Sequence, residues 1–284
     1  MADNENCFVG ENNTGHIWDA DLRELSNPPP RWWTIAFWIS MGWVVVYAIL
    51  YPMIPYGQEA TKGVLGWTQM KEYHQGMAEI EAVRAPFEER IAQMSAAEIL
   101  ADDGLASYVV ASSKVLYGDF CSACHGSGGM GGPGYPVLAD DEWLWGGTIE
   151  AVVTSITNGR RGVMTAHGKI LNDEEINSLA QSVIARDVAS NPLYMSKGCI
   201  ACHGMDGGGM AILGAPSLVD TIYRFLPEEG ETQLESVKYT IRHGVNDPSD
   251  PNTREAEMPA FRDRLSESDI KKLAVYVHRM GGGQ

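Results

Sequence analysis

Two five-residue stretches place thiols and an imidazole at a spacing that suits covalent chemistry. They are Cys121-Ser122-Ala123-Cys124-His125 and Cys199-Ile200-Ala201-Cys202-His203, and each is followed by glycine. Two thiols in one turn of backbone can both add across the vinyl groups of one porphyrin, and the adjacent histidine can then ligate the iron. The pattern predicts two c-type haems. The expected attachment points are Cys121, Cys124, Cys199 and Cys202, and the expected proximal ligands are His125 and His203.

Other chemistry is compatible with a single motif of this kind, because a C-x-x-C pair also suits a thioredoxin-like redox site or half of a zinc site. The chain has five cysteines, of which four belong to the two motifs. The fifth, Cys7, lies in a polar N-terminal stretch and receives no role. No nearby cysteine completes a four-cysteine zinc site, so haem attachment is the favoured interpretation.

Each haem iron also takes a sixth ligand from the opposite face of the ring, supplied from well downstream of the motif. Met164 and Met258 hold equivalent positions in the two halves of the sequence. We expect Met164 to pair with His125 on haem 1 and Met258 to pair with His203 on haem 2. A proline follows Met258, as is typical of a ligand loop, but none follows Met164, and His167 remains a rival ligand there.

The pattern G-x-P-x-L follows each motif, at residues 134–138 and 214–218. A backbone carbonyl in such a loop can accept a hydrogen bond from the proximal histidine and fix its tautomer. Pro136 and Pro216 are therefore expected to orient the two proximal histidines through their backbone carbonyls.

The elements that must position these residues occur twice in the C-terminal part of the chain. The segment from Ile149 matches that from Leu234, and the segment from Leu171 matches that from Leu265. Apolar residues at helical spacing and capping boxes favour helices, and no stretch shows convincing strand alternation. The sequence therefore predicts an all-α fold in which one N-terminal transmembrane helix precedes two cytochrome c-type haem domains.

The N-terminal part contains the membrane helix. Residues 32–58 carry no charge, and about 20 apolar residues at about 1.5 Å each cross a hydrocarbon core of about 30 Å. A buried core helix is the alternative. Arg23 and Arg31 precede the stretch, and c-type haem attachment in bacteria takes place outside the cytoplasmic membrane. We therefore expect a single-pass protein of the bacterial inner membrane with periplasmic haem domains.

The expected organisation has five parts. They are a cytoplasmic N-terminal segment (1–31), a transmembrane anchor (32–56), a helical tether (57–104), cytochrome c domain 1 (105–190) and cytochrome c domain 2 (191–284). Pro86 is expected to interrupt the helices of the tether. The formal net charge of −16 argues against nucleic-acid binding and suits a basic protein partner.

The N-terminal third also carries a family resemblance. The chain reads TGHIWD at residues 14–19, ELSNPPPRWW at 24–33 and YP at 51–52. This resembles the dihaem cytochrome c subunit (subunit III, the CcoP/FixP family) of cbb3-type cytochrome c oxidases, in which the pattern is roughly TGHxWDG, EL.NPLPRWW and VVYP. The resemblance covers nearly the whole chain. Departures are Ala20, Pro29 and Thr165, of which only the last lies in a ligand loop.

The resemblance implies an electron-transfer role without a catalytic residue in this chain. Such a subunit accepts electrons from cytochrome c or the bc1 complex. It passes them through a monohaem cytochrome c subunit to the haem–copper subunit that reduces oxygen. It contacts membrane lipid and binds no nucleic acid. The alternatives are the dihaem electron-acceptor subunit of a periplasmic dehydrogenase and a free membrane-tethered cytochrome c shuttle.

Overall fold

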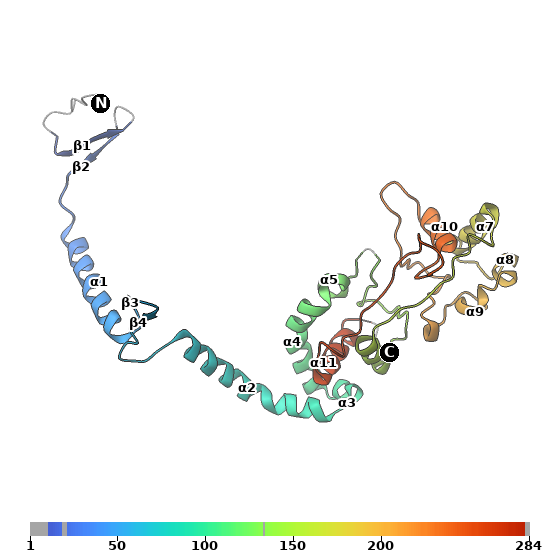
Figure 1. The fold of residues 1–284 in the computed structure, drawn as a ribbon, viewed down its shortest axis with the longest axis horizontal. Coiled ribbons are helices and arrows are strands. Elements are labelled where there is room, and N and C mark those ends of the chain that lie inside the picture. The colour runs from blue at the N-terminus through green and yellow to red at the C-terminus, as the bar shows by residue number, and fades with distance from the viewer. Residues whose placement is uncertain (1–10, 19–21, 133, 282–284) are drawn as a thin grey trace. The chain divides into compact units, whose positions relative to one another are not determined.

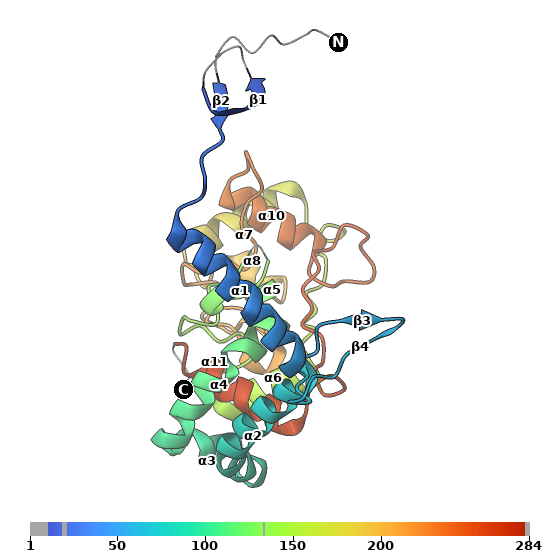
Figure 2. The ribbon, with the colours of Figure 1, turned by 90° about the vertical axis from the view of Figure 1, so that its left-hand side faces the viewer.

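The computed structural model describes residues 11–18, 22–132 and 134–281. Its contacts divide the chain into two units, Met1–Val83 and Arg84–Gln284. Figure 1 shows the order of the elements along the chain, and Figure 2 shows them from a second direction. Cys7 and Ala20 lie outside the described residues.

The first unit contains two short hairpins and one long apolar helix. Strands β1 (Asn13–Trp18) and β2 (Leu22–Leu25) pair antiparallel, as do β3 (Pro55–Tyr56) and β4 (Glu59–Ala60). These strands were not expected, because each is too short for its alternation to stand out in the sequence. The helical character expected for the rest of the chain is confirmed.

Helix α1 (Arg31–Leu50) is the candidate membrane span, and it is the one such helix among the described residues. An 18-residue window of this helix has a mean hydropathy of 1.8, and none of the helix residues is buried within the chain. At about 1.5 Å per residue its length is about 30 Å. The anchor was expected to reach residue 56, but the helix ends at Leu50, because Pro52 disfavours helical backbone at Tyr51.

The chain returns to the end of α1 after the β3–β4 hairpin. The backbone N–H groups of Val64 and Leu65 donate to the carbonyls of Ile49 and Leu50, at 2.9 and 3.1 Å. These contacts satisfy carbonyl groups that a helix C-terminus otherwise leaves unpaired. Helix α2 (Gln69–Gln93) then begins in the first unit and ends in the second. It continues through Pro86, which was expected to interrupt it; the absent Pro N–H removes one helical hydrogen bond without ending the helix.

The second unit is built from short helices that follow the same order twice. They are α3 (Ala96–Ala101), α4 (Asp103–Phe120), α5 (Ser122–His125), α6 (Ile149–Asn158), α7 (Asp173–Ile184), α8 (Pro192–Ser196), α9 (Ile200–His203), α10 (Gln233–His243) and α11 (Glu267–His278), with single 3₁₀ turns at Ser127–Gly129 and Ala211–Leu213. The side chains of Asn172 and Ser266 cap α7 and α11, as the sequence predicts.

Two hydrophobic clusters divide these helices in an unexpected way. The larger cluster joins α3, which precedes the first repeat, and α4 and α6 of that repeat to α11 of the second, and Leu273 of α11 is fully buried in it. The smaller cluster joins α7 of the first repeat to α8 and α10 of the second. Figure 1 shows α11 beside α4, and α7 beside α10. The last helices are thus exchanged between the repeats, whereas domains at 105–190 and 191–284 would keep each last helix in its own repeat.

Candidate haem sites

The first motif lies where helix α4 ends. Cys121 caps α4 in helical conformation, and α5 continues the turn from Ser122 to His125. Cys121 is half-buried, and Cys124 is exposed. Gly126 then reverses the chain with φ of 74°. One helical turn therefore presents both thiols and the imidazole from a single short segment, as covalent attachment to one porphyrin requires.

The second motif has the same local structure on a shorter preceding helix. Cys199 is half-buried, Cys202 is exposed, and His203 is 8% exposed. Gly204 again ends the turn with φ of 79°.

A tyrosine supports each motif, and the sequence reasoning missed both. Tyr117 Oη donates to the Gly126 carbonyl at 3.1 Å, and Tyr194 Oη donates to the Gly204 carbonyl at 2.6 Å. Both tyrosines are buried, and burial raises the pKa of each hydroxyl to about 12. The signal in the sequence was a tyrosine shortly before each Cys pair, but its spacing differs between the repeats.

Both proximal histidines face a proline carbonyl. His125 Nδ1 lies 3.0 Å from the Pro136 carbonyl, and His203 Nδ1 lies 3.0 Å from that of Pro216. A carbonyl can only accept, so Nδ1 carries the proton and Nε2 keeps the lone pair that binds a metal. Burial lowers the pKa of both imidazoles, and the proximity of His167 adds to the lowering at His203. Both effects favour the neutral form that acts as a ligand.

The two methionine loops cross between the repeats. Met258 exchanges two backbone hydrogen bonds with Arg160, at 2.9 and 2.8 Å, just after α6 ends. Met164 exchanges two with Val245, both at 2.9 Å, just after α10 ends. We call α6 and α10 the mid helices of the two repeats. Each methionine loop therefore runs past the mid helix of the other repeat.

Further contacts follow the same crossed pairing. The backbone N–H of Phe261 donates to the carbonyl of Ile156, and that of His167 donates to the carbonyl of Ile241, each at 3.1 Å. His167 thus holds the position that Phe261 occupies in the other loop, where the side chain packs into the larger cluster. Unlike Phe261, His167 has a ring nitrogen, Nδ1, that is buried without a hydrogen-bond partner.

The crossing changes which motif each methionine accompanies. Met258 and Cys121 both pack against the larger cluster. Met164 belongs instead to the loop whose His167 lies close enough to His203 to affect its pKa. The expected pairs, Met164 with His125 and Met258 with His203, do not agree with this chain path. The contacts of a methionine loop with a mid helix are alike in the two repeats, so sequence alone cannot tell which partner is used.

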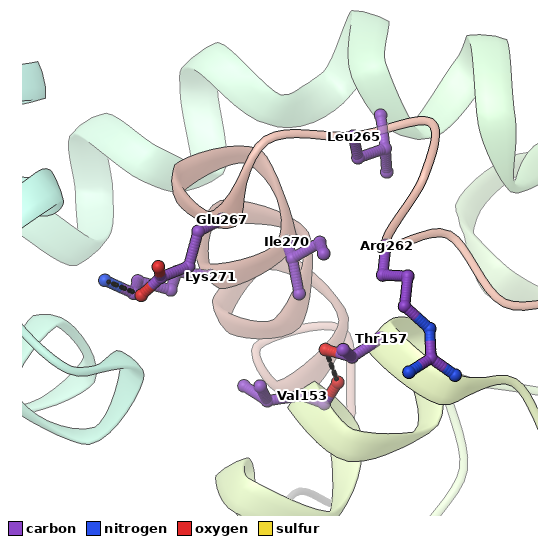
Figure 3. Close-up of a pocket in the computed structure, with 7 residues that line it drawn as sticks. All are labelled: Val153, Thr157, Arg262, Leu265, Glu267, Ile270 and Lys271. Atoms are coloured by element: carbon purple, nitrogen blue, oxygen red, sulfur yellow. Dashed lines mark hydrogen bonds and ion pairs between the residues drawn. The ribbon is translucent and has the colours of Figure 1, made fainter.

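Side chains of both repeats also meet at the surface of the larger cluster. Figure 3 shows Val153 and Thr157 of α6 facing Leu265 and Ile270 across a shallow pocket. His243 Nδ1 lies 3.1 Å from the Asp250 carboxylate.

Comparison with known proteins identifies the family. A model described as the N-terminal domain of cytochrome oxidase-cbb3, FixP, matches residues 10–58. A second, described as cytochrome C oxidase, cbb3-type, subunit III, matches residues 109–181 and 190–277. The two segments of the second match each contain one C-x-x-C-H motif.

Curated relatives match along nearly their whole length. The chain is 37% identical over 292 residues to the cbb3-type cytochrome c oxidase subunit FixP of Rhizobium meliloti (strain 1021), covering 97% of this chain and 96% of that protein. It is 36% identical over 311 residues to the subunit CcoP of Azospirillum sp. (strain B510), covering all of both chains. The chain therefore belongs to the FixP/CcoP family of cbb3-type cytochrome c oxidase subunits.

Proposed function

We propose that this chain carries two covalently bound haems C, with His125 and Met258 as axial ligands of one iron and His203 and Met164 as those of the other. The observation that carries this proposal is the pair of C-x-x-C-H turns in which the histidine Nδ1 faces a carbonyl at 3.0 Å. That geometry fits a haem, because it leaves a neutral Nε2 beside two thiols on one turn.

The chemistry of attachment and tuning belongs to the chain's own residues. The thiols of Cys121 and Cys124, and those of Cys199 and Cys202, would each hold one haem through thioether bonds to its two vinyl groups. A bound haem supplies a one-electron Fe(III)/Fe(II) couple. A methionine thioether that holds the iron would favour Fe(II) and raise the reduction potential. The prolyl carbonyl holds the imidazole in one orientation and makes it a better donor.

The chain is a cytochrome c electron-transfer subunit of a cbb3-type oxidase, an oxidoreductase complex, as its family shows. In our proposal it receives electrons from a cytochrome c or the bc1 complex and passes them through a monohaem cytochrome c subunit to the haem–copper subunit. Oxygen reduction then takes place in that partner subunit. This chain contributes no catalytic residue.

The proposed location is the bacterial inner membrane, with α1 as the single anchor and the haem-bearing unit in the periplasm. The length and hydropathy of α1 support an anchor. Arg23 precedes it, Arg31 is its first residue, and Lys62 is the first basic residue after it, which is consistent with a cytoplasmic N-terminus. Covalent haem attachment outside the cytoplasm supports the same orientation.

A mild-detergent purification through a tag on this chain tests the assignment. We expect b-type haem to copurify, a c-type haem content of two per chain, and oxygen uptake driven by reduced cytochrome c. A c-type spectrum alone, without oxygen uptake under conditions that retain the other subunits, contradicts the oxidase role and favours a shuttle. A copurifying quinone- or flavin-type cofactor favours the dehydrogenase subunit.

A further inference from the structure

Arg160 and Arg254 place two guanidinium groups in equivalent surroundings in the two repeats. The Cζ atom of Arg160 lies 4.8 Å from the ring centre of Trp145, and that of Arg254 lies 4.7 Å from the ring centre of Phe225. Trp145 and Phe225 are themselves equivalent, since each lies seven residues after the leucine of its G-x-P-x-L loop. The two arginines therefore stack on matching aromatic rings.

The hydrogen bonds of the two guanidinium groups to the mid helices α6 and α10 are also equivalent. Arg160 Nη2 donates to the carbonyl of Ala151, and Arg254 Nη2 donates to the carbonyl of Ser236, both at 3.4 Å. Ala151 and Ser236 are equivalent positions of α6 and α10 in the repeat. Each guanidinium also donates to a serine hydroxyl on its mid helix, at 2.8 and 3.0 Å.

The two arginines reach this position by different chain routes. Arg160 directly follows Gly159, whereas Arg254 comes ten residues after the equivalent Gly244. A parallel bridge brings Arg254 beside Val245, which is the residue that corresponds to Arg160. Aligning the two repeats in sequence does not pair the two arginines. Each repeat therefore places a guanidinium at the equivalent position from a different place in its sequence.

Neither cation has a carboxylate partner in the described part of the chain, where no ion pair includes Arg160 or Arg254. Arg254 Nε is buried without a hydrogen-bond partner. Burial lowers the pKa of both guanidiniums, while Tyr239, Glu231 and Glu228 act on Arg254 in the opposite direction. Arginine keeps its charge. A half-buried cation that no carboxylate contacts directly is unfavourable, and an anion bound beside each arginine removes that penalty.

We propose that Arg160 and Arg254 each bind a propionate carboxylate of one haem. Arg160 pairs through its backbone with Met258 and therefore belongs to the haem on His125. Arg254 adjoins Val245, the partner of Met164, and belongs to the haem on His203. The fork of a guanidinium matches a carboxylate at two points, and the aromatic ring beneath holds the fork in place. The inference rests on the haem sites of the proposed function.

The consequence is a higher reduction potential for each haem. An unpaired propionate charge stabilises Fe(III) more than Fe(II), so neutralising it favours reduction. Both arginines act on the iron through the propionate and are positioning residues. Their replacement therefore changes the potential of the haem on the same side.

The experiment uses the whole oxidase complex and a graded series, Arg160→Gln, Arg160→Lys, Arg254→Gln and Arg254→Lys. Arg161→Gln is the matched control, because Arg161 is the next residue but its exposed side chain pairs at 3.5 Å with exposed Glu257. Haem content is measured first, and then both c-haem midpoint potentials by spectroelectrochemical titration. A wild-type chain that carries no c-type haem contradicts the proposed function. Variants that carry both haems test this inference alone.

We expect each Gln variant to lower a different one of the two potentials. A tenfold fall in the equilibrium constant for reduction, about 59 mV for one electron, is the size expected. Lys variants should fall between wild type and Gln, because lysine keeps the charge but not the fork. Arg161→Gln should match wild type.

Unchanged potentials in haem-loaded Gln variants overturn the inference, as does an equal shift in the Arg161 control. If a Gln variant does not attach haem, the potential is measured instead on the Lys variant of the same arginine. A lowered potential of the corresponding haem then supports the proposal, and a wild-type potential contradicts it.

Discussion

At the scale of single residues, the sites depend on hydrogen bonds that leave one atom free to act. The imidazole Nδ1 of His125 and of His203 is committed to a prolyl carbonyl at 3.0 Å. Only Nε2 can then face a metal. Tyr117 and Tyr194 act on the same turn from the other side, because each binds the carbonyl of the glycine after the motif.

The crossed methionine pairing can be tested at this scale in a chain whose second motif is disabled by Cys199→Ala and Cys202→Ala. Adding Met258→Ala should lower the potential of the remaining haem, because the iron loses a thioether that favours Fe(II). Adding Met164→Ala instead should leave that potential unchanged. Redox titration of the single c-type haem measures both. The reverse result is the one expected if each repeat supplied its own methionine.

Asp247 predicts a pH dependence of the Met164 loop. Its carboxylate accepts hydrogen bonds from the backbone N–H of Ala166 at 2.6 Å and of Ser249 at 2.8 Å. These hydrogen bonds lower the pKa of Asp247 below its ordinary value of 3.8, and the bond from Ala166 has the largest effect. Because the folded-state pKa is depressed, the stabilisation is present above the unfolded value and is lost as the pH falls below about 3.8 through the folded value.

Asp247→Asn should therefore weaken the anchoring of this loop at neutral pH and remove that component of acid lability. Acid titrations followed by the spectrum of the methionine-ligated haem measure it, with exposed Asp263→Asn as the control. An Asp247→Asn protein with the wild-type acid profile would show that the carboxylate does not hold the loop.

At the scale of elements, the passage of each methionine loop past the helix of the other repeat depends on a glycine. Helices α6 and α10 end at Gly159 and Gly244, with φ of 69° and 68°. A Cβ at Gly159 would overlap the carbonyl oxygen of Met258, and one at Gly244 would overlap that of Met164. Only glycine allows a ligand loop to pass so close to a helix end in this backbone conformation.

Gly159→Ala should therefore displace the Met258 loop. The residue has φ of 69° and ψ of −179°, a conformation that costs a non-glycine residue about 1–3 kcal/mol. The free energy of unfolding should fall by about that amount, and the methionine-to-iron absorption band should weaken. Gly118→Ala is the control, because Gly118 lies inside α4 with open space around it, where alanine stabilises a helix by about 0.5–1 kcal/mol. Equal stability losses in the two variants would contradict the role of Gly159.

At the scale of the whole molecule, the haem-bearing unit is one interwoven structure. The core around α4 is completed by α11, which comes from the far end of the chain, and that around α10 is completed by α7. Neither repeat buries its own apolar helix face alone. The two sites are therefore expected to depend on each other for stability, in contrast to two domains joined by a linker.

The whole chain carries a net charge of −16, and this predicts that it attracts a basic donor protein. Oxygen uptake driven by a basic cytochrome c should fall several-fold as ionic strength rises from about 10 mM to 150 mM, because salt shortens the range of the attraction. Uptake driven by a small uncharged donor should change little. Equal salt dependence with the two donors would exclude electrostatic steering by the protein donor.

Much of the molecule could be predicted from the sequence, because local chemistry determines it. The C-x-x-C-H turns, the prolyl carbonyls, the helix caps and the apolar helix near the N-terminus each depend on residues close together in the chain. The exchange of α7, α11 and the two methionine loops is different. Gly159 and Gly244 offer the same surface to either methionine loop. The sequence therefore determined that a loop contacts each glycine, and only the tertiary structure decided that each loop contacts the glycine of the other repeat. Arg254 could not be matched to Arg160 in advance either, because it follows Gly244 by ten residues where Arg160 follows Gly159 directly. Only the bridge between Val245 and Arg254 brings it to the equivalent place.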